Sequence, residues 1–148
     1  MKKTDYWNET LNHLMGKIKE LELALKDTQD SANSDTKSSA GDKHESSRAM
    51  AHIENERLAN QLKNLQNQIE TLQKINPSIT SESINFGSLV DCKTIVFFLS
   101  VGVGKIRINE NNFFAIAPDS PVGKGMLGKK SGDTIMIGND LKTIHYVE

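Results

Sequence analysis

Hydrophobic side chains in the first half of the chain repeat with the period of a coiled-coil helix. One series has alternating spacings of four and three residues, and its members are Trp7, Leu11, Leu14, Ile18, Leu21 and Leu25. A second series has the same spacing, and its members are Ala51, Asn55, Leu58, Leu62, Leu65, Ile69 and Leu72. Residues spaced in this way share one face of a helix. The sequence therefore predicts two long helices, each with one apolar stripe that must pack against a partner.

A polar, serine-rich segment, DTQDSANSDTKSSAGDKHESS, separates the two series. Two one-faced helices joined in this way predict an antiparallel helical hairpin over residues 1–76, with its tip near 38–47. The second helix is expected over roughly 43–75, about 48 Å long at 1.5 Å per residue. A dimerising coiled coil is the alternative. Asn55 is a polar residue within the stripe, a type that sets helix register at some expense of stability.

The hydrophobic period changes after Pro77. Proline cannot continue a helix, so the hairpin is expected to end near residue 76, and residues 77–83 are expected to form a linker. Short runs rich in β-branched and aromatic residues follow, and they predict strands. The runs are INFGSLVDC, KTIVFFLSVG, GKIRINEN, NFFAIAP, DTIMIGN and KTIHYVE.

Turn signals divide these strands. SVGVGK and NENN are typical of hairpin turns. Ser120 can cap a short helix over residues 120–127 that has Pro121 at its first position and is closed by Gly128. Residues 84–148 are thus expected to form a small antiparallel sheet with one short helix. With the hairpin, the fold class is α+β.

Composition narrows the function. The 148 residues carry a formal net charge of −1, which gives no electrostatic basis for wrapping DNA or RNA but allows docking to a protein that holds nucleic acid. Cys92 is the only cysteine, so an internal disulfide is excluded. The N-terminal residues lack the apolar core of a signal peptide, and the apolar run TIVFFLSVGV is shorter than the roughly 20 residues of a membrane span. A cytoplasmic location is expected.

The order of a helical hairpin, a Gly-Asp-x-x-Glu tip, a linker and a β-rich tail resembles the Gre transcript-cleavage factors of bacterial RNA polymerase. SPVGKGMLGKKSGD is the most specific match, in a tail that resembles their FKBP-like C-terminal domain. The family tip reads Gly-Asp-Leu-Ser-Glu-Asn. Here it reads Gly41-Asp42-Lys43-His44-Glu45-Ser46, so the glycine and both acidic residues match, while the third, fourth and sixth positions differ.

The resemblance implies a transcription elongation factor and not an enzyme. A monomer would bind RNA polymerase through the C-terminal domain, insert the tip into the secondary channel and reach the RNA 3′ end indirectly. There Asp42, as the main ligand, and Glu45 would help hold a Mg²⁺ that is shared with the polymerase and is not bound by the isolated protein. Mg²⁺ prefers oxygen ligands, and a second metal can activate the water that cleaves backtracked RNA.

Several alternatives remain open. Asp42 and Glu45 also fit a capping box at the start of the second helix. Because the tip differs from the family pattern, a channel regulator that inhibits or modulates the polymerase without stimulating cleavage is the second reading. The FKBP-like tail makes a prolyl isomerase or chaperone a third, through an aromatic pocket. Its candidate aromatics are Phe86, Phe97, Phe98, Phe113, Phe114 and Tyr146.

Overall fold

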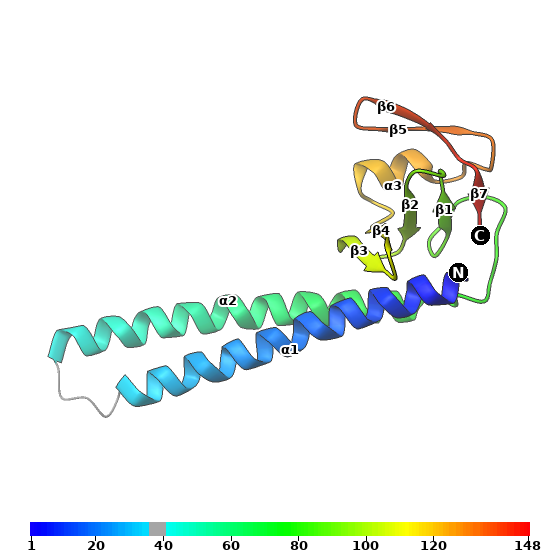
Figure 1. Ribbon diagram of the computed structural model, residues 1–148. Coiled ribbons are helices and arrows are strands. Elements are labelled where there is room, and N and C mark those ends of the chain that lie inside the picture. Colours follow the sequence, from blue (N-terminus) through cyan, green and yellow to red (C-terminus); the bar gives the residue numbers. More distant parts are fainter. Residues whose placement is uncertain (36–40) are drawn as a thin grey trace. The chain divides into compact units, whose positions relative to one another are not determined.

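The computed structural model describes the backbone of residues 1–35 and 41–148 and the side chains of residues 1–30 and 46–148 (Figure 1). The chain divides into two compact units. The hairpin unit comprises Leu14–Asn67, and the sheet unit comprises Met1–His13 together with Gln68–Glu148. Among the described helices, none has an apolar stretch long enough to cross a membrane.

Two long helices run antiparallel, as the hydrophobic pattern predicts (Figure 1). Helix α1 spans Lys3–Asp35 and helix α2 spans Gly41–Gln73, two residues ahead of the predicted range at each end. Every residue of the two predicted stripes is buried or half-buried, and in the hairpin unit Leu14 and Leu58 are the most enclosed. The stripes therefore pack within one chain, which favours the hairpin over a dimerising coiled coil.

The sheet unit contains a five-stranded sheet in the order β3-β4-β2-β1-β7. Its strands are β1 (Leu89–Asp91), β2 (Val96–Leu99), β3 (Gly104–Ile108), β4 (Asn111–Ile116) and β7 (Tyr146–Val147). A separate pair joins β5 (Thr134–Ile137) to β6 (Asp140–Thr143), and the short helix α3 spans Pro121–Met126. The predicted α+β class is confirmed.

The prediction that SVGVGK forms a hairpin turn is wrong. β4 lies between β2 and β3 and pairs in parallel with β2, in a register that sets Phe97 opposite Phe114. Lys105 and Arg107 of β3 are exposed, which suits its edge position, because lysine and arginine there discourage pairing with other chains. Phe113 of β4 is fully buried, as suits an interior strand.

Two other turns are informative. The predicted NENN turn does join β3 to β4 as an antiparallel pair, with Asn109 in the left-handed region at φ 53°. The run KTIHYVE was expected as one strand but contributes to both β6 and β7. The β5–β6 turn was not predicted, and it uses Gly138 at φ 62°, a conformation that glycine adopts without steric penalty.

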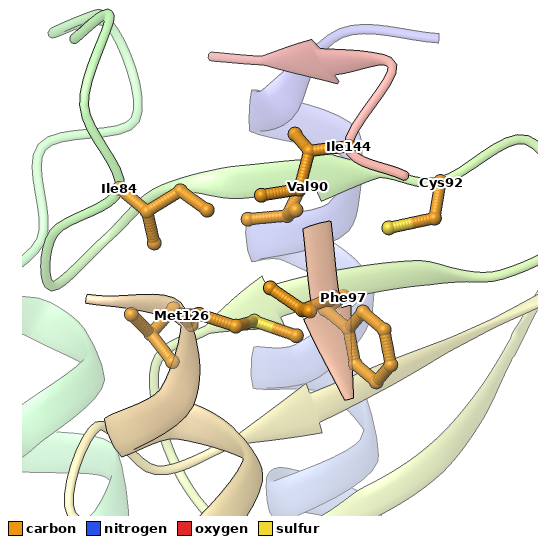
Figure 2. Close-up of a cluster of buried hydrophobic side chains, with 8 residues drawn as sticks. Ile84, Val90, Cys92, Phe97, Met126 and Ile144 are labelled. Atoms are coloured by element: carbon orange, nitrogen blue, oxygen red, sulfur yellow. The ribbon is translucent and has the colours of Figure 1, made fainter. Parts of the chain in front are cut away.

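One hydrophobic cluster holds the sheet, α3 and the β5–β6 pair together (Figure 2). Its members come from segments far apart in the sequence, namely Ile84, Val90, Cys92, Phe97, Leu99, Met126, Ile135 and Ile144. Burying side chains of this size contributes about 1.5–3 kcal/mol each. The cluster therefore joins β1, β2, α3 and β5, which are far apart in the sequence.

The first turns of α1 belong to the sheet unit. Tyr6 packs edge-on against Phe113, with ring centroids 5.0 Å apart and planes at 85°. The Trp7 Nε1–H donates a hydrogen bond to the Leu72 carbonyl oxygen at 3.0 Å. The buried Lys3 ammonium donates to the Ile79 carbonyl oxygen, and burial lowers the pKa of Lys3. These contacts anchor the start of α1 to the end of α2 and to the sheet.

Candidate functional site

The predicted tip residues occupy the first turns of α2. Helix α1 ends at Asp35 and α2 begins at Gly41, so Asp42 is the second residue of α2 and Glu45 is the fifth. Helix positions three residues apart are neighbours on one face. The side chains of Asp42, Glu45 and His44 lie outside the described residues, so their role stays a prediction.

The helix bounds bear on the capping-box alternative. A capping box needs its first member immediately before the helix, where the side chain accepts a hydrogen bond from an amide two or three residues on. Helix α2 starts at Gly41, and the side chains of Asp42 and Glu45 lie outside the described residues, so the capping box stays an alternative. A carboxylate there still suits the positive end of the helix dipole.

The described residues that follow the tip carry paired charges on exposed surface. Arg57 and Glu54 form an ion pair, with 2.5 Å between Nη2 and Oε1, and the hydrogen bond from Arg57 lowers the pKa of Glu54. His52 Nε2 lies 3.4 Å from Glu56 Oε1. No group of three or more potential metal ligands gathers in the part of the chain that the structure describes. His52 thus has a carboxylate neighbour there and no ligand cluster.

The most specific sequence match, SPVG, is a helix start. Ser120 is the N-cap of α3, and its hydroxyl accepts from the Gly123 amide at 3.1 Å and donates to the Ala117 carbonyl oxygen at 2.6 Å. Pro121 is the first helical residue, as predicted. A Cβ atom at position 123 would lie 2.2 Å from the Ala117 oxygen, so only glycine fits. This motif shapes the fold and leaves the serine hydroxyl fully engaged.

The aromatic residues do not gather around a proline-sized pocket. Phe97, Phe98 and Phe113 are buried in the core, while Phe86 and Tyr146 are exposed. Phe114 lines a cavity of about 570 Å³, but that cavity also contains charged groups such as Asp91 and Lys105. These positions give the isomerase hypothesis no apolar, aromatic-lined site.

Two further features lie outside the predicted site, and the sequence signals only the first. The Asn55 side-chain oxygen is shielded from solvent and has no hydrogen-bond partner in the described structure. Lys93 takes a left-handed conformation at φ 69° in the turn between β1 and β2, beside a cavity that Lys142 also lines. The stripe spacing marked Asn55 as unusual. Nothing in the sequence indicates that Lys93 and Lys142 line the same cavity.

Comparisons with known proteins give matches at the level of solved structures. No family model and no curated protein matches the chain. The crystal structure of GreA factor homolog 1 (Gfh1) protein of Thermus thermophilus is 17% identical, with a TM-score of 0.37 and coverage of 93% of both chains. A structure of the transcription factor Gfh1 is 18% identical, with a TM-score of 0.36 and coverage of 91% of this chain and 89% of that one. The chain is thus similar to these two structures over nearly its whole length.

Proposed function

We propose that this chain is a Gre-type transcription factor that binds RNA polymerase and stimulates the polymerase's own cleavage of backtracked RNA. The observation that carries the proposal is the position of Asp42 and Glu45 in the first turns of α2, directly after the chain reverses between two 33-residue helices. The tip motif Gly-Asp-x-x-Glu supplies acidic residues at the place where this mechanism needs them.

The form of the hairpin unit supports entry into a narrow channel. The unit contains 22 residues of α1 and 27 of α2, since it runs from Leu14 to Asn67. At a rise of 1.5 Å per residue these segments are about 33 Å and about 40 Å long. The helices pack through one row of side chains per helix, and the opposite faces are exposed. A two-helix arm of this kind is slender enough to deliver a side chain to a recessed site.

The donor set fits magnesium. Carboxylate oxygens are the ligands that Mg²⁺ prefers, and one or two of them suffice when another protein holds the rest of the site. Asp42 would be the main ligand and Glu45 its partner. A second metal in a phosphodiester site supplies an activated water and balances the leaving oxygen. The chain's own part is to bring the carboxylates and hold them beside the scissile phosphate, so the isolated protein is expected to lack nuclease activity.

The test is cleavage of RNA in backtracked complexes of the cognate polymerase, with wild type, Asp42→Asn and Glu45→Gln in parallel. Asparagine keeps the shape of aspartate but removes the charge that binds the metal. We expect Asp42→Asn to reduce stimulated cleavage on the order of 100-fold and Glu45→Gln to reduce it less.

Asp30→Asn is the matched control, because Asp30 is an exposed aspartate on α1 outside the Gly-Asp-x-x-Glu motif. This variant should cleave like wild type. Full stimulation by Asp42→Asn, with its far-ultraviolet circular dichroism unchanged, would show that Asp42 holds no metal.

A second candidate is a channel regulator that slows the polymerase without stimulating cleavage. It is favoured by the tip itself, where Lys43, His44 and Ser46 replace the leucine, serine and asparagine of the family pattern. A lysine beside the carboxylates competes with the metal for their charge. The same assay separates the candidates, because slowed synthesis without cleavage supports the regulator. Restoring the family residues at these three positions should then produce cleavage.

A further inference from the structure

A second cavity of the sheet unit has an unusual charge composition. It encloses about 480 Å³ beside the β1–β2 turn and β6. Its polar lining is basic or hydroxyl-bearing, and its members are Lys93, Thr94, Ser131, Lys142, Thr143 and His145. Within the described part of the chain, no aspartate or glutamate lines this cavity. The lining residues thus supply hydrogen-bond donors and two ammonium groups, and the carboxylate of Asp91 lies next to the lining and not within it.

The neighbouring cavity of about 570 Å³ provides a contrast within the same unit. Lys93 and Thr94 line both cavities. In the cavity of about 570 Å³, however, the carboxylates of Asp91 and Glu110 balance the charge of the lysines. Asp91 is the acidic residue nearest in sequence to the shared turn, and its Oδ1 accepts a hydrogen bond from the Lys93 amide at 2.7 Å. The β1–β2 turn thus separates a charge-balanced hollow from a basic one.

Two lysines reach the basic cavity from different segments. Lys142 is half-buried on β6, and its ammonium lowers the pKa of the Cys92 thiol, against the larger effects of burial and of the Asp91 charge, which both raise that pKa. Lys142 and Cys92 both line the cavity. Lys93 holds a left-handed conformation in which asparagine or glycine is favoured. Position 93 is thus occupied by a lysine although its backbone conformation is unfavourable for that residue.

The loop before β5 sets the position of His145. The Ser131 hydroxyl donates to the His145 carbonyl oxygen at 2.7 Å, and the His145 amide donates to the Asp91 carbonyl oxygen at 2.8 Å. Both bonds fix the backbone of His145 beside the β1–β2 turn. Thr94 and Thr143 also line the cavity.

We propose that this cavity binds a small phosphate-bearing anion, either inorganic phosphate or the phosphate ester of a small metabolite. Phosphate oxygens accept charge-assisted hydrogen bonds from ammonium groups and further hydrogen bonds from hydroxyls. The volume lies within the usual range for small-molecule sites, about 300–1,000 Å³. No phenylalanine, tyrosine or tryptophan of the described residues lines the cavity, so the large ring faces that support single-strand binding by base stacking are missing from this lining. The site is separate from the tip carboxylates and does not depend on the proposed function.

The test is a nuclear magnetic resonance titration of the full chain, labelled with nitrogen-15, at constant ionic strength. Inorganic phosphate and glycerol 3-phosphate are the two probes, and sodium chloride is the reference salt. We expect saturable shifts of the amides of Lys93, Thr94 and Lys142–His145. Tighter binding of glycerol 3-phosphate would identify a metabolite ester as the ligand class, and equal or weaker binding would identify the phosphate group alone.

Variants make the assignment specific. Lys93→Asn removes one ammonium and suits the left-handed backbone, so it should keep its thermal stability while phosphate binding weakens about tenfold. Lys142→Gln should weaken binding by a similar factor. Lys124→Gln is the control, because Lys124 is an exposed lysine of α3 that does not line the cavity, and it should bind like wild type.

Three results would overturn the proposal. They are shifts that never saturate, equal weakening in Lys124→Gln, and saturable binding of a short RNA oligonucleotide when neither small probe binds. None of them bears on transcript cleavage, because the titration contains no polymerase.

Discussion

The hairpin unit and the sheet unit bury their side chains in different ways. Of the buried apolar residues in the described structure, the hairpin unit contains Leu14 and Leu58, and the remainder lie in the sheet unit. A pair of helices has a single interface, so each stripe residue is covered from one side and most are half-buried. In the sheet unit the helix, the sheet and the β5–β6 pair enclose residues such as Leu99 and Met126 completely.

This difference indicates how each unit tolerates change. The hairpin unit depends on repetition, so the loss of one contact leaves its neighbours in place. Its outer faces even expose Leu23, Met50 and Ile53. The sheet unit depends on individual close contacts between segments, such as that of Gly123 with the Ala117 carbonyl oxygen, and no neighbouring contact can replace them. Substitutions are therefore expected to destabilise the sheet unit more than the hairpin unit.

The largest expected effect comes from the closest approach in the sheet unit. Gly123→Ala would place a Cβ atom 2.2 Å from the Ala117 carbonyl oxygen. The backbone of α3 must move away, which also disturbs the Ser120 cap. We expect a loss of about 3 kcal/mol in the free energy of unfolding, measured by urea denaturation.

Gly125→Ala tests whether that loss is steric. Gly125 lies in the same helix, and a Cβ atom there meets nothing within 4 Å. This variant should be as stable as wild type or more stable by about 0.4–1 kcal/mol, because alanine restricts the unfolded chain. Equal destabilisation by both substitutions would refute the close-approach explanation.

A smaller effect of opposite sign is expected in the hairpin unit. Asn55 occupies a stripe position and buries an oxygen without a hydrogen-bond partner. Asn55→Leu replaces it by an apolar side chain and should raise the free energy of unfolding by about 1 kcal/mol. Asn60→Leu, at an exposed position of the same helix, is the control and should change stability little. Destabilisation by Asn55→Leu would mean that the amide oxygen does have a partner in solution.

The smallest effect is a pH dependence in the sheet unit. Burial, followed by the charge of Asp91, raises the pKa of the Cys92 thiol. The unfolded chain therefore ionises this thiol first, so the stability that Cys92 contributes is complete below about pH 8.5 and declines as the pH rises above it. Denaturation of wild type and Cys92→Ala across this range measures the effect. The decline should be weaker in Cys92→Ala, and parallel curves would contradict the assignment.

Much of the fold could be predicted because its signals are local. The spacing of Leu14, Ile18 and Leu21 identifies a helix face without knowledge of the partner. Ser120 followed by Pro121 identifies a helix start. The order of the strands was not predicted, because SVGVGK has the composition of a hairpin turn although β4 separates the strands that it joins. Strand neighbours depend on which side chains the whole core accepts.

The candidate sites also differ in whether their signals are local in the sequence. The acidic residues of the tip were found from their order in the sequence, and their position at the start of α2 follows from the helix bounds. The basic cavity was not found, since Lys93, Ser131 and Lys142 come from three separate segments.

The sequence by itself determined the two helices, the cap of α3 and the acidic residues of the tip, because each depends on residues within a few turns of one another. Only the tertiary structure decided the strand order, the need for glycine at position 123 and the gathering of lysines around one cavity. These depend on distances between segments, which the fold sets when Ile84, Met126 and Ile144 are buried together.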